Sequence, residues 1–240
     1  MQKPYLYETH LHTAPVSRCA QATVEQSLRY YKSLGYAGVC ITNHFLDGNI
    51  NVSHDLPYEE RIHFYCADYE EGARLADEIG IRVFFGIEMS FRGADFLVFG
   101  LDKEWLLAHP EIMTMEQVEK LDFMASEGAF IVQAHPYREA RYIPYFRLFP
   151  RHIHAVEVYN ASQPELPNEM AHLLAKGYDL LPFAGSDNHR AELTRVLGGV
   201  MSDRPISDIG DFVTMAKFGD LTPFVYKVDE NSFSEITLSN

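Results

Sequence analysis

The chain of 240 residues contains few cysteines, few basic side chains and no long apolar run. Its three cysteines, Cys19, Cys40 and Cys66, form no CxxC pair, and their odd number argues against a disulfide framework. No apolar stretch approaches the roughly 20 residues of a membrane-spanning helix. The opening residues, MQKPYLYETH, lack the apolar core of a signal peptide. We therefore expect a cytoplasmic protein with no membrane partner.

Basic residues are outnumbered, because 20 Lys and Arg stand against 34 Asp and Glu, which gives a formal net charge of −14. Non-specific binding to nucleic acid requires a basic surface, so we do not expect a long nucleic acid as a partner. The charge does not exclude a small anionic substrate, since bound divalent cations would reverse the sign locally.

The chain also lacks internal repeats and linkers rich in Gly, Ser or Pro, so we expect one domain over residues 1–240. Apolar runs alternate with stretches of helical periodicity, which is typical of a parallel sheet. A (β/α) barrel needs roughly 250 residues, and this length suits one. The expected strands cover 6–8, 37–42, 82–85, 95–99, 129–133, 153–158, 180–185 and 197–201, and the expected helices cover 23–34, 58–79, 114–126, 167–176 and 207–218.

Two of these helices begin with residues suited to capping. Thr23 fits the N-cap position of its helix, and Thr114 with Gln117 resembles a capping box. The segment 220–240 contains strand-like pieces that the pattern does not place.

The first apolar strand leads into His10 and His12, two residues apart. Side chains alternate on an extended backbone, so both imidazoles point to the same side. Two neutral imidazoles that face one point are suitable ligands for a transition metal. The alternative is a strand end with two ordinary histidines, and this pair alone does not decide between them.

Further residues of metal-binding type follow directly after later strands. His44, Glu88 and His135 each follow one, and Asp187 and His189 follow another. In a barrel all parallel strands end on the same face, where active sites are built, so we expect these side chains to converge with His10 and His12. The other histidines lie in loops, helices or at strand starts, and we expect them to be surface or structural residues.

The pieces HLH with a trailing SxC, TNH, GIE, AHP, VEVYN and GSDNH together resemble the PHP (polymerase and histidinol phosphatase) family over residues 7–189. The resemblance implies a distorted (β/α)7 barrel, similar to a TIM barrel, with two or three divalent metal ions. Zinc, iron and manganese all suit the residue types present. Characterised members of this family hydrolyse phosphate esters.

The resemblance also implies which side chains bind the metals. The implied ligands are imidazoles, carboxylates and one thiol: His10, His12, Cys19, His44, Glu88, His135, Asp187 and His189. The HLH pair, Glu88 and Asp187 would hold the first metal, and Glu88 would bridge to a second that also takes His135. The third would take His44 and His189 with Cys19, where some members have His. A buried, metal-free Cys19 is the alternative.

Three other positions complete the expected site. Asn43 stands where the family often has Asp, which bears on the occupancy of the third metal site. Arg138 lies close to His135 in sequence, and we expect its guanidinium to grip a phosphate with two parallel hydrogen bonds. Asn160 ends a strand on the same face, and we expect it to orient a ligand or the substrate.

The sequence thus predicts a metal-dependent phosphoesterase acting on a small phosphorylated substrate. A hydroxide that bridges two metals would attack phosphorus, and Arg138 would stabilise the charge on the equatorial oxygens. His189, or a water on the third metal, would protonate the leaving group. Three alternatives stay open: a histidinol phosphatase, an amidohydrolase-like enzyme that cleaves C–N bonds, and a scaffold without activity. Amidohydrolases commonly carry a bridging lysine, whereas this chain offers Glu88.

Overall fold

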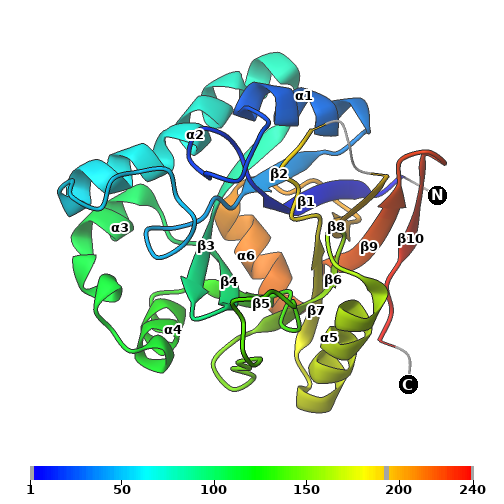
Figure 1. Cartoon of the computed structure of the whole chain (residues 1–240). Coiled ribbons are helices and arrows are strands. Elements are labelled where there is room, and N and C mark those ends of the chain that lie inside the picture. Colours follow the sequence, from blue (N-terminus) through cyan, green and yellow to red (C-terminus); the bar gives the residue numbers. More distant parts are fainter. Residues whose placement is uncertain (1–2, 192–194, 239–240) are drawn as a thin grey trace.

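A single mixed sheet forms the centre of the molecule (Figure 1) in the computed structural model, which describes residues 3–191 and 195–238. Its strands follow the order β10-β9-β8-β1-β2-β3-β4-β5-β6-β7. They are β1 (Tyr5–Leu11), β2 (Gly38–Ile41), β3 (Arg82–Phe91), β4 (Ala94–Phe99), β5 (Phe130–Ala134), β6 (Ala155–Asn160), β7 (Leu181–Gly185), β8 (Val196–Ser202), β9 (Thr222–Lys227) and β10 (Ser232–Glu235).

Helices connect the strands. They are α1 (Val24–Ser33), α2 (Tyr58–Ile79), α3 (Lys103–Ala108), α4 (Gln117–Ser126), α5 (Glu165–Tyr178) and α6 (Ile209–Phe218), with a short 3₁₀ helix at Pro110–Met113. Most of them lie around the outside of the curled sheet (Figure 1). Within residues 3–191 and 195–238, no helix combines the length and the apolar character needed to cross a membrane.

The sheet curls so far that β7, which stands at one end of the strand order, lies against β1. The Thr9 hydroxyl donates to the carbonyl of Ala184 at 2.5 Å, and the backbone N–H of His12 donates to the carbonyl of Asn188 at 3.0 Å. The buried carboxylate of Glu8 accepts hydrogen bonds from the backbone of His10 and of Ser186. These bonds bring the ends of β1 and β7 together.

The expected (β/α)7 barrel of parallel strands is corrected by this topology. Only β1–β3 and β5–β7 form parallel sets, whereas β4 is antiparallel to both its neighbours and β8 is antiparallel to β1 and β9. The reason at β4 is local. Arg92 and Gly93, with φ of 48° and 90°, make a tight reversal that leaves no chain for a crossover helix. The segment 220–240, which the sequence did not place, contributes β9 and β10.

The predicted capping is half right. Thr23 is the N-cap of α1 and forms a capping box with Gln26, whose backbone N–H donates to the Thr23 hydroxyl. The expected box at Thr114 is wrong, because the 3₁₀ helix ends there and α4 begins only at Gln117. The short helices before α4 were also not expected.

Helix α6 lies at the centre of the curled sheet (Figure 1). Its Phe212 packs against Phe84, Phe99 and Phe183 from three strands, with ring centroids 5.1–6.2 Å apart. Each such buried ring contributes roughly 1.5–3 kcal/mol of apolar burial. The rings occupy the end where the parallel strands begin, so the opposite end, with the predicted ligands, is left open to solvent.

Candidate metal centre

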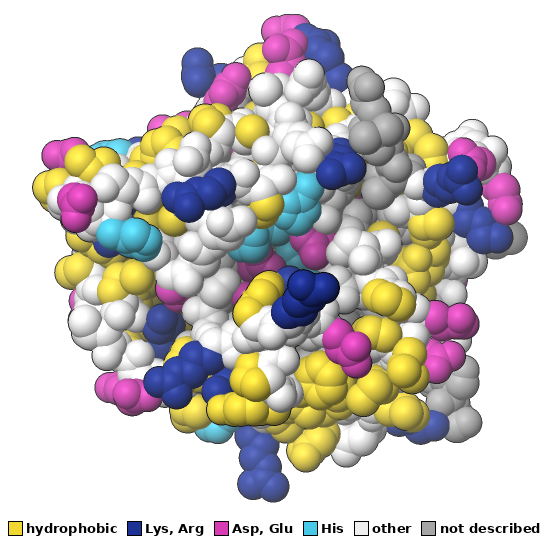
Figure 2. Space-filling view, viewed as in Figure 1, with side chains coloured by type: hydrophobic (Ala, Val, Ile, Leu, Met, Phe, Trp, Pro, Cys, Tyr) yellow, Lys and Arg dark blue, Asp and Glu magenta, His cyan; other side chains and the backbone are white. Residues whose placement is uncertain are grey.

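The predicted ligands do converge at the carboxyl ends of the parallel strands, around a cavity of about 550 Å³. Figure 2 shows histidine and acidic side chains gathered in a hollow at the middle of this face. The side chains that line the cavity include Cys19, His44, Glu88, His135, Asp187 and His189. His10 and His12 lie beneath them and are fully buried.

Glu88 stands at the centre of the cluster, and four histidines approach its carboxylate. Oε1 lies 3.1 Å from Nε2 of His10 and 3.4 Å from Nε2 of His135. Oε2 lies 3.3 Å from Nε2 of His12 and 2.6 Å from Nδ1 of His44. One carboxylate that faces two pairs of imidazoles has the placement expected of a bridging ligand.

Asp187 closes the cluster from the opposite side. Its Oδ1 lies 3.4 Å from Nε2 of His12 and 3.5 Å from Nδ1 of His189, and its Oδ2 lies 3.8 Å from Nε2 of His135. The backbone φ is 53° at Asp187 and 25° at His135, a region that residues with a side chain rarely adopt. Strain of this kind is typical of functional positions.

Glu157, which the sequence analysis missed, orients His10. Its Oε1 lies 2.9 Å from Nδ1 of His10, and its Oε2 accepts hydrogen bonds from the backbone N–H of His135 and the amide of Asn160. A carboxylate behind a histidine fixes the ring and leaves the other nitrogen for a metal. The sequence did contain one signal for Glu157: an ionisable residue stands between the apolar residues of β6, where burial requires a partner.

Asn160 ends β6 as expected, but it is fully buried and is not among the residues that line the cavity. Its amide nitrogen donates to Glu157, and its Oδ1 lies 2.7 Å from the hydroxyl oxygen of Ser162, which in turn lies 3.0 Å from Oδ2 of Asp187. Asn160 therefore lies behind two of the predicted ligands: it contacts Glu157, which orients His10, and Ser162, which contacts Asp187.

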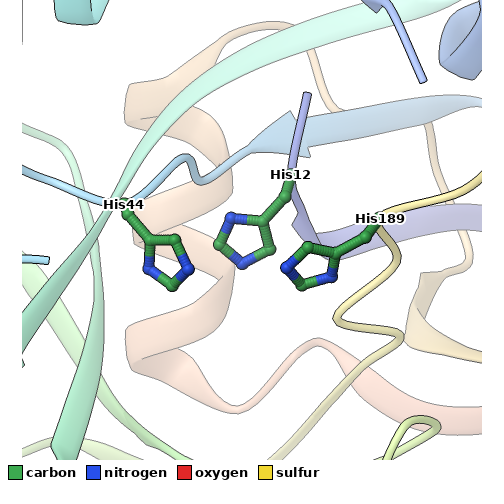
Figure 3. A group of neighbouring side chains, drawn as sticks. All are labelled: His12, His44 and His189. Carbon is green, nitrogen blue, oxygen red and sulfur yellow. The ribbon is translucent and has the colours of Figure 1, made fainter. Parts of the chain in front are cut away.

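His12, His44 and His189 point toward one another from three strand ends (Figure 3). Ring centroids lie 4.4 Å apart for His12 and His44, and 4.3 Å apart for His12 and His189. Sγ of Cys19 lies 3.1 Å from Nε2 of His189. The predicted third set of His44, His189 and Cys19 is thus brought together, with His12 beside it.

The electrostatics differ among the histidines of the cluster, because burial and the nearby His44 lower the pKa of His12 to about 3. Burial lowers the pKa of His10 and His44, but charged neighbours outweigh it. Three carboxylates raise the pKa of His10 well above its usual value, and Glu88 with Cys19 raises that of His44 to about 11. Burial raises the pKa of the Cys19 thiol, yet its contacts with His189 and His44 lower it to about 6. The thiolate that results is the metal-binding form of cysteine.

The residues present fit divalent cations. Four groups of three side chains each place their nitrogen or oxygen atoms within 4.8 Å of one another: His12, His44 and His189; His10, His135 and Asp187; His10, His12 and Glu88; and Glu88, Asp95 and His135. Nδ1 of His44 and Oε2 of Glu88 are both buried and lie 2.6 Å apart, and among the described residues neither has a partner with hydrogen-bond geometry. A cation between such atoms would satisfy both.

Arg138 lines the same cavity, as predicted, and lies close to His135. Its Nη2 lies 3.2 Å from Oδ2 of Asp95, and its buried Nε makes no hydrogen bond within the described part of the chain. Asp95 was not expected at the site. It stands near the start of the antiparallel strand β4, which is the same end of the sheet at which the parallel strands finish.

Comparisons with known proteins give matches by structure alone. No protein-family description and no curated protein matches the sequence. A two-domain protein from Bacteroides vulgatus, which contains a predicted PHP-like metal-dependent phosphoesterase, superposes with a TM-score of 0.65 at 12% identity over 92% of this chain. This chain spans 64% of the length of that protein.

Two further structures are similar. A protein from Bifidobacterium adolescentis, provisionally assigned as a metal-dependent phosphoesterase, has a TM-score of 0.52 at 14% identity, with 78% of this chain and 89% of that chain covered. An amidohydrolase from Chromobacterium violaceum has a TM-score of 0.54 at 14% identity, with 88% and 96% covered. The chain therefore has the fold of PHP-like proteins, and this likeness supports the resemblance to that family in its sequence motifs.

Proposed function

We propose that the protein is a metal-dependent phosphoesterase that hydrolyses a small phosphate ester. The observation that carries the proposal is the central carboxylate of Glu88, which four histidines approach within 3.4 Å at the floor of one cavity. Arg138, on the wall of that cavity, supplies a cationic group able to grip a phosphate.

Bound divalent ions would supply Lewis acidity and an activated water in this cavity. His10, His12, Glu88 and Asp187, with His44, His135, His189 and Cys19 around them, would hold these ions. Arg138 donates its free N–H groups to the phosphoryl oxygens and offsets their growing negative charge. If His189 does not hold an ion, its half-buried imidazole at the cavity wall would give a proton to the leaving alkoxide; otherwise a water would do so.

The test combines metal analysis with a substrate panel. The purified protein is analysed for zinc, iron and manganese, stripped with a chelator and reloaded with each ion. It is then assayed on phosphate monoesters, histidinol phosphate, phosphodiesters and a matched set of amides. We expect metal-dependent turnover of phosphate esters, which His12→Ala abolishes.

His63→Ala is the matched control, because His63 is an exposed histidine on α2. It should leave metal content and turnover unchanged. Stoichiometric metal with no hydrolysis of any ester, or full activity in His12→Ala, would overturn the proposal.

A C–N hydrolase is the second candidate, because an amidohydrolase has a similar fold. Enzymes of both kinds also use an HxH pair after their first strand. The central carboxylate of Glu88 favours the phosphoesterase, because amidohydrolases commonly use a bridging lysine. Turnover of the amides alone would reverse this preference.

A further inference from the structure

A buried cluster of polar side chains lies directly behind His12. It joins Thr13 and Ser17 from the loop after β1, Asn43 from the end of β2, and Asp68 from the middle of α2. Each of the four is at most 2% exposed, so their hydrogen bonds are shielded from water and their directions can be assigned from the partners.

The orientation of the Asn43 amide follows from two partners of fixed character. Its Oδ1 lies 2.7 Å from the backbone N–H of Thr13, which can only donate. Its Nδ2 lies 3.1 Å from Oδ2 of Asp68, which accepts when ionised. The opposite orientation would set donor against donor and acceptor against acceptor. The carboxylate of Asp68 therefore holds the amide oxygen toward Ser17.

The single proton of the Ser17 hydroxyl is then committed. Oγ of Ser17 lies 2.8 Å from Oδ1 of Asn43, and two oxygens at that distance need the hydroxyl proton between them. The same Oγ accepts from the backbone N–H of His44 at 3.0 Å. Toward Nδ1 of His12, 3.0 Å away, Ser17 has only a lone pair to offer. Nδ1 must carry the hydrogen.

We propose that Asp68, Asn43 and Ser17 form a hydrogen-bond relay that fixes the tautomer of His12. With the hydrogen on Nδ1, the lone pair lies on Nε2, the atom that faces Glu88 at 3.3 Å and Asp187 at 3.4 Å. The three are positioning residues, since they act on a bound ion through His12 and, in the case of Ser17, also through the backbone of His44. The inference rests on the proposed function where it concerns metal binding.

The relay also explains why Asn rather than Asp precedes His44. An aspartate at position 43 would set its carboxylate against that of Asp68, and like charges in a buried site repel strongly. In this cluster the only carboxylate is that of Asp68. The amide of Asn43 connects it to Ser17 by hydrogen bonds. Exchanging the two residues should therefore be tolerated better than changing Asn43 alone.

The first experiment reads the tautomer directly. Two-bond ¹H–¹⁵N spectra of the metal-free full chain, labelled on histidine and assigned with His12→Gln, should show His12 neutral with its hydrogen on Nδ1. Ser17→Ala should lose this preference. Zinc affinity, measured by calorimetry, should fall 10- to 100-fold, as is usual when a support behind a ligand is removed.

The second experiment is a rescue. Asn43→Asp should weaken zinc binding by a similar factor, and Asp68→Asn added to it should recover most of the loss. Asp77→Asn is the matched control on the exposed face of α2 and should bind zinc like the wild type. Thermal melting without zinc checks that each variant is folded. If Asn43→Asp does not fold, the spectrum of Ser17→Ala tests the relay instead.

The relay would be overturned if His12 kept its hydrogen on Nδ1 in Ser17→Ala. It would also be overturned if the double variant bound zinc no more tightly than folded Asn43→Asp. Wild-type protein that takes up no zinc, iron or manganese would instead overturn the proposed function. The spectrum of the metal-free protein would still decide the tautomer.

Discussion

Replacing Gly185 with alanine should break the pair of His10 and Glu157. Gly185 ends β7, buried against the end of β1. A Cβ atom there would lie 2.5 Å from Cβ of His10 and 2.7 Å from Oε1 of Glu157, both closer than real contacts allow. The neighbours are the stem of a buried histidine and a carboxylate that makes three hydrogen bonds, so neither can swing aside.

The cost has two parts. Overpacking a close contact typically costs about 1–3 kcal/mol, and weakening a hydrogen bond to a charged group costs about 1.5–3 kcal/mol. We expect the free energy of unfolding of Gly185→Ala to fall by about 3 kcal/mol. Zinc affinity should fall at least 10-fold, because the carboxylate no longer fixes the ring of His10.

Gly177→Ala is the matched control. Gly177 is exposed inside α5, and a Cβ there meets nothing within 4 Å. Alanine is the better helix former, so this variant should be more stable by roughly 0.5–1 kcal/mol. Urea unfolding of both variants, with and without zinc, measures the difference. If Gly185→Ala unfolds within about 0.5 kcal/mol of the wild type and binds zinc equally well, the assigned contact between β7 and β1 is wrong.

Three further predictions address the substrate, the capping and the metal. Arg138→Ala should mainly raise KM for phosphate esters and leave kcat within a few-fold; unchanged KM and kcat would exclude Arg138 as the phosphate clamp. Thr23→Ala should lower the free energy of unfolding by about 1 kcal/mol through the lost N-cap. The hydroxyl of Thr114 donates to the carbonyl of Glu111 within its own turn, so Thr114→Ala should change the free energy of unfolding by less than half as much in the same urea titration. Chelation should lower Tm, since free metal at 100 times Kd stabilises the folded state by about 2.7 kcal/mol; a Tm indifferent to chelator and to added zinc would contradict this.

The sequence was most informative where one local rule decided the geometry. His10 and His12 share a side because an extended backbone alternates, and His10 in β1 and His12 directly after it have their Nε2 atoms 3.3 Å apart. His135 follows directly after β5 and His44 comes three residues after the end of β2, so their convergence needed only the assumption that parallel strands end on one face. The bounds of α2 could be read from its periodicity and from Gly80 behind it.

The residues that were missed depend on the fold rather than on a local pattern. Asp95 reaches the cavity only because β4 runs opposite to its neighbours, and nothing near it in sequence reveals that direction. Glu157 resembles any polar residue in a strand until its partner His10, 147 positions away, is known. Thr114 failed for the opposite reason: its capping pattern is common, and Pro110 had already begun a 3₁₀ turn that ends there.

The closing of β7 against β1 has a consequence for how the protein is made. His10 and Asp187 are 177 positions apart and must meet before the cluster exists, so almost the whole chain has to leave the ribosome first. Contacts between such distant positions slow folding, because a large loop must close before any energy is returned. A metal ion held by both residues, as we propose, would therefore bind only after β1 and β7 have come together.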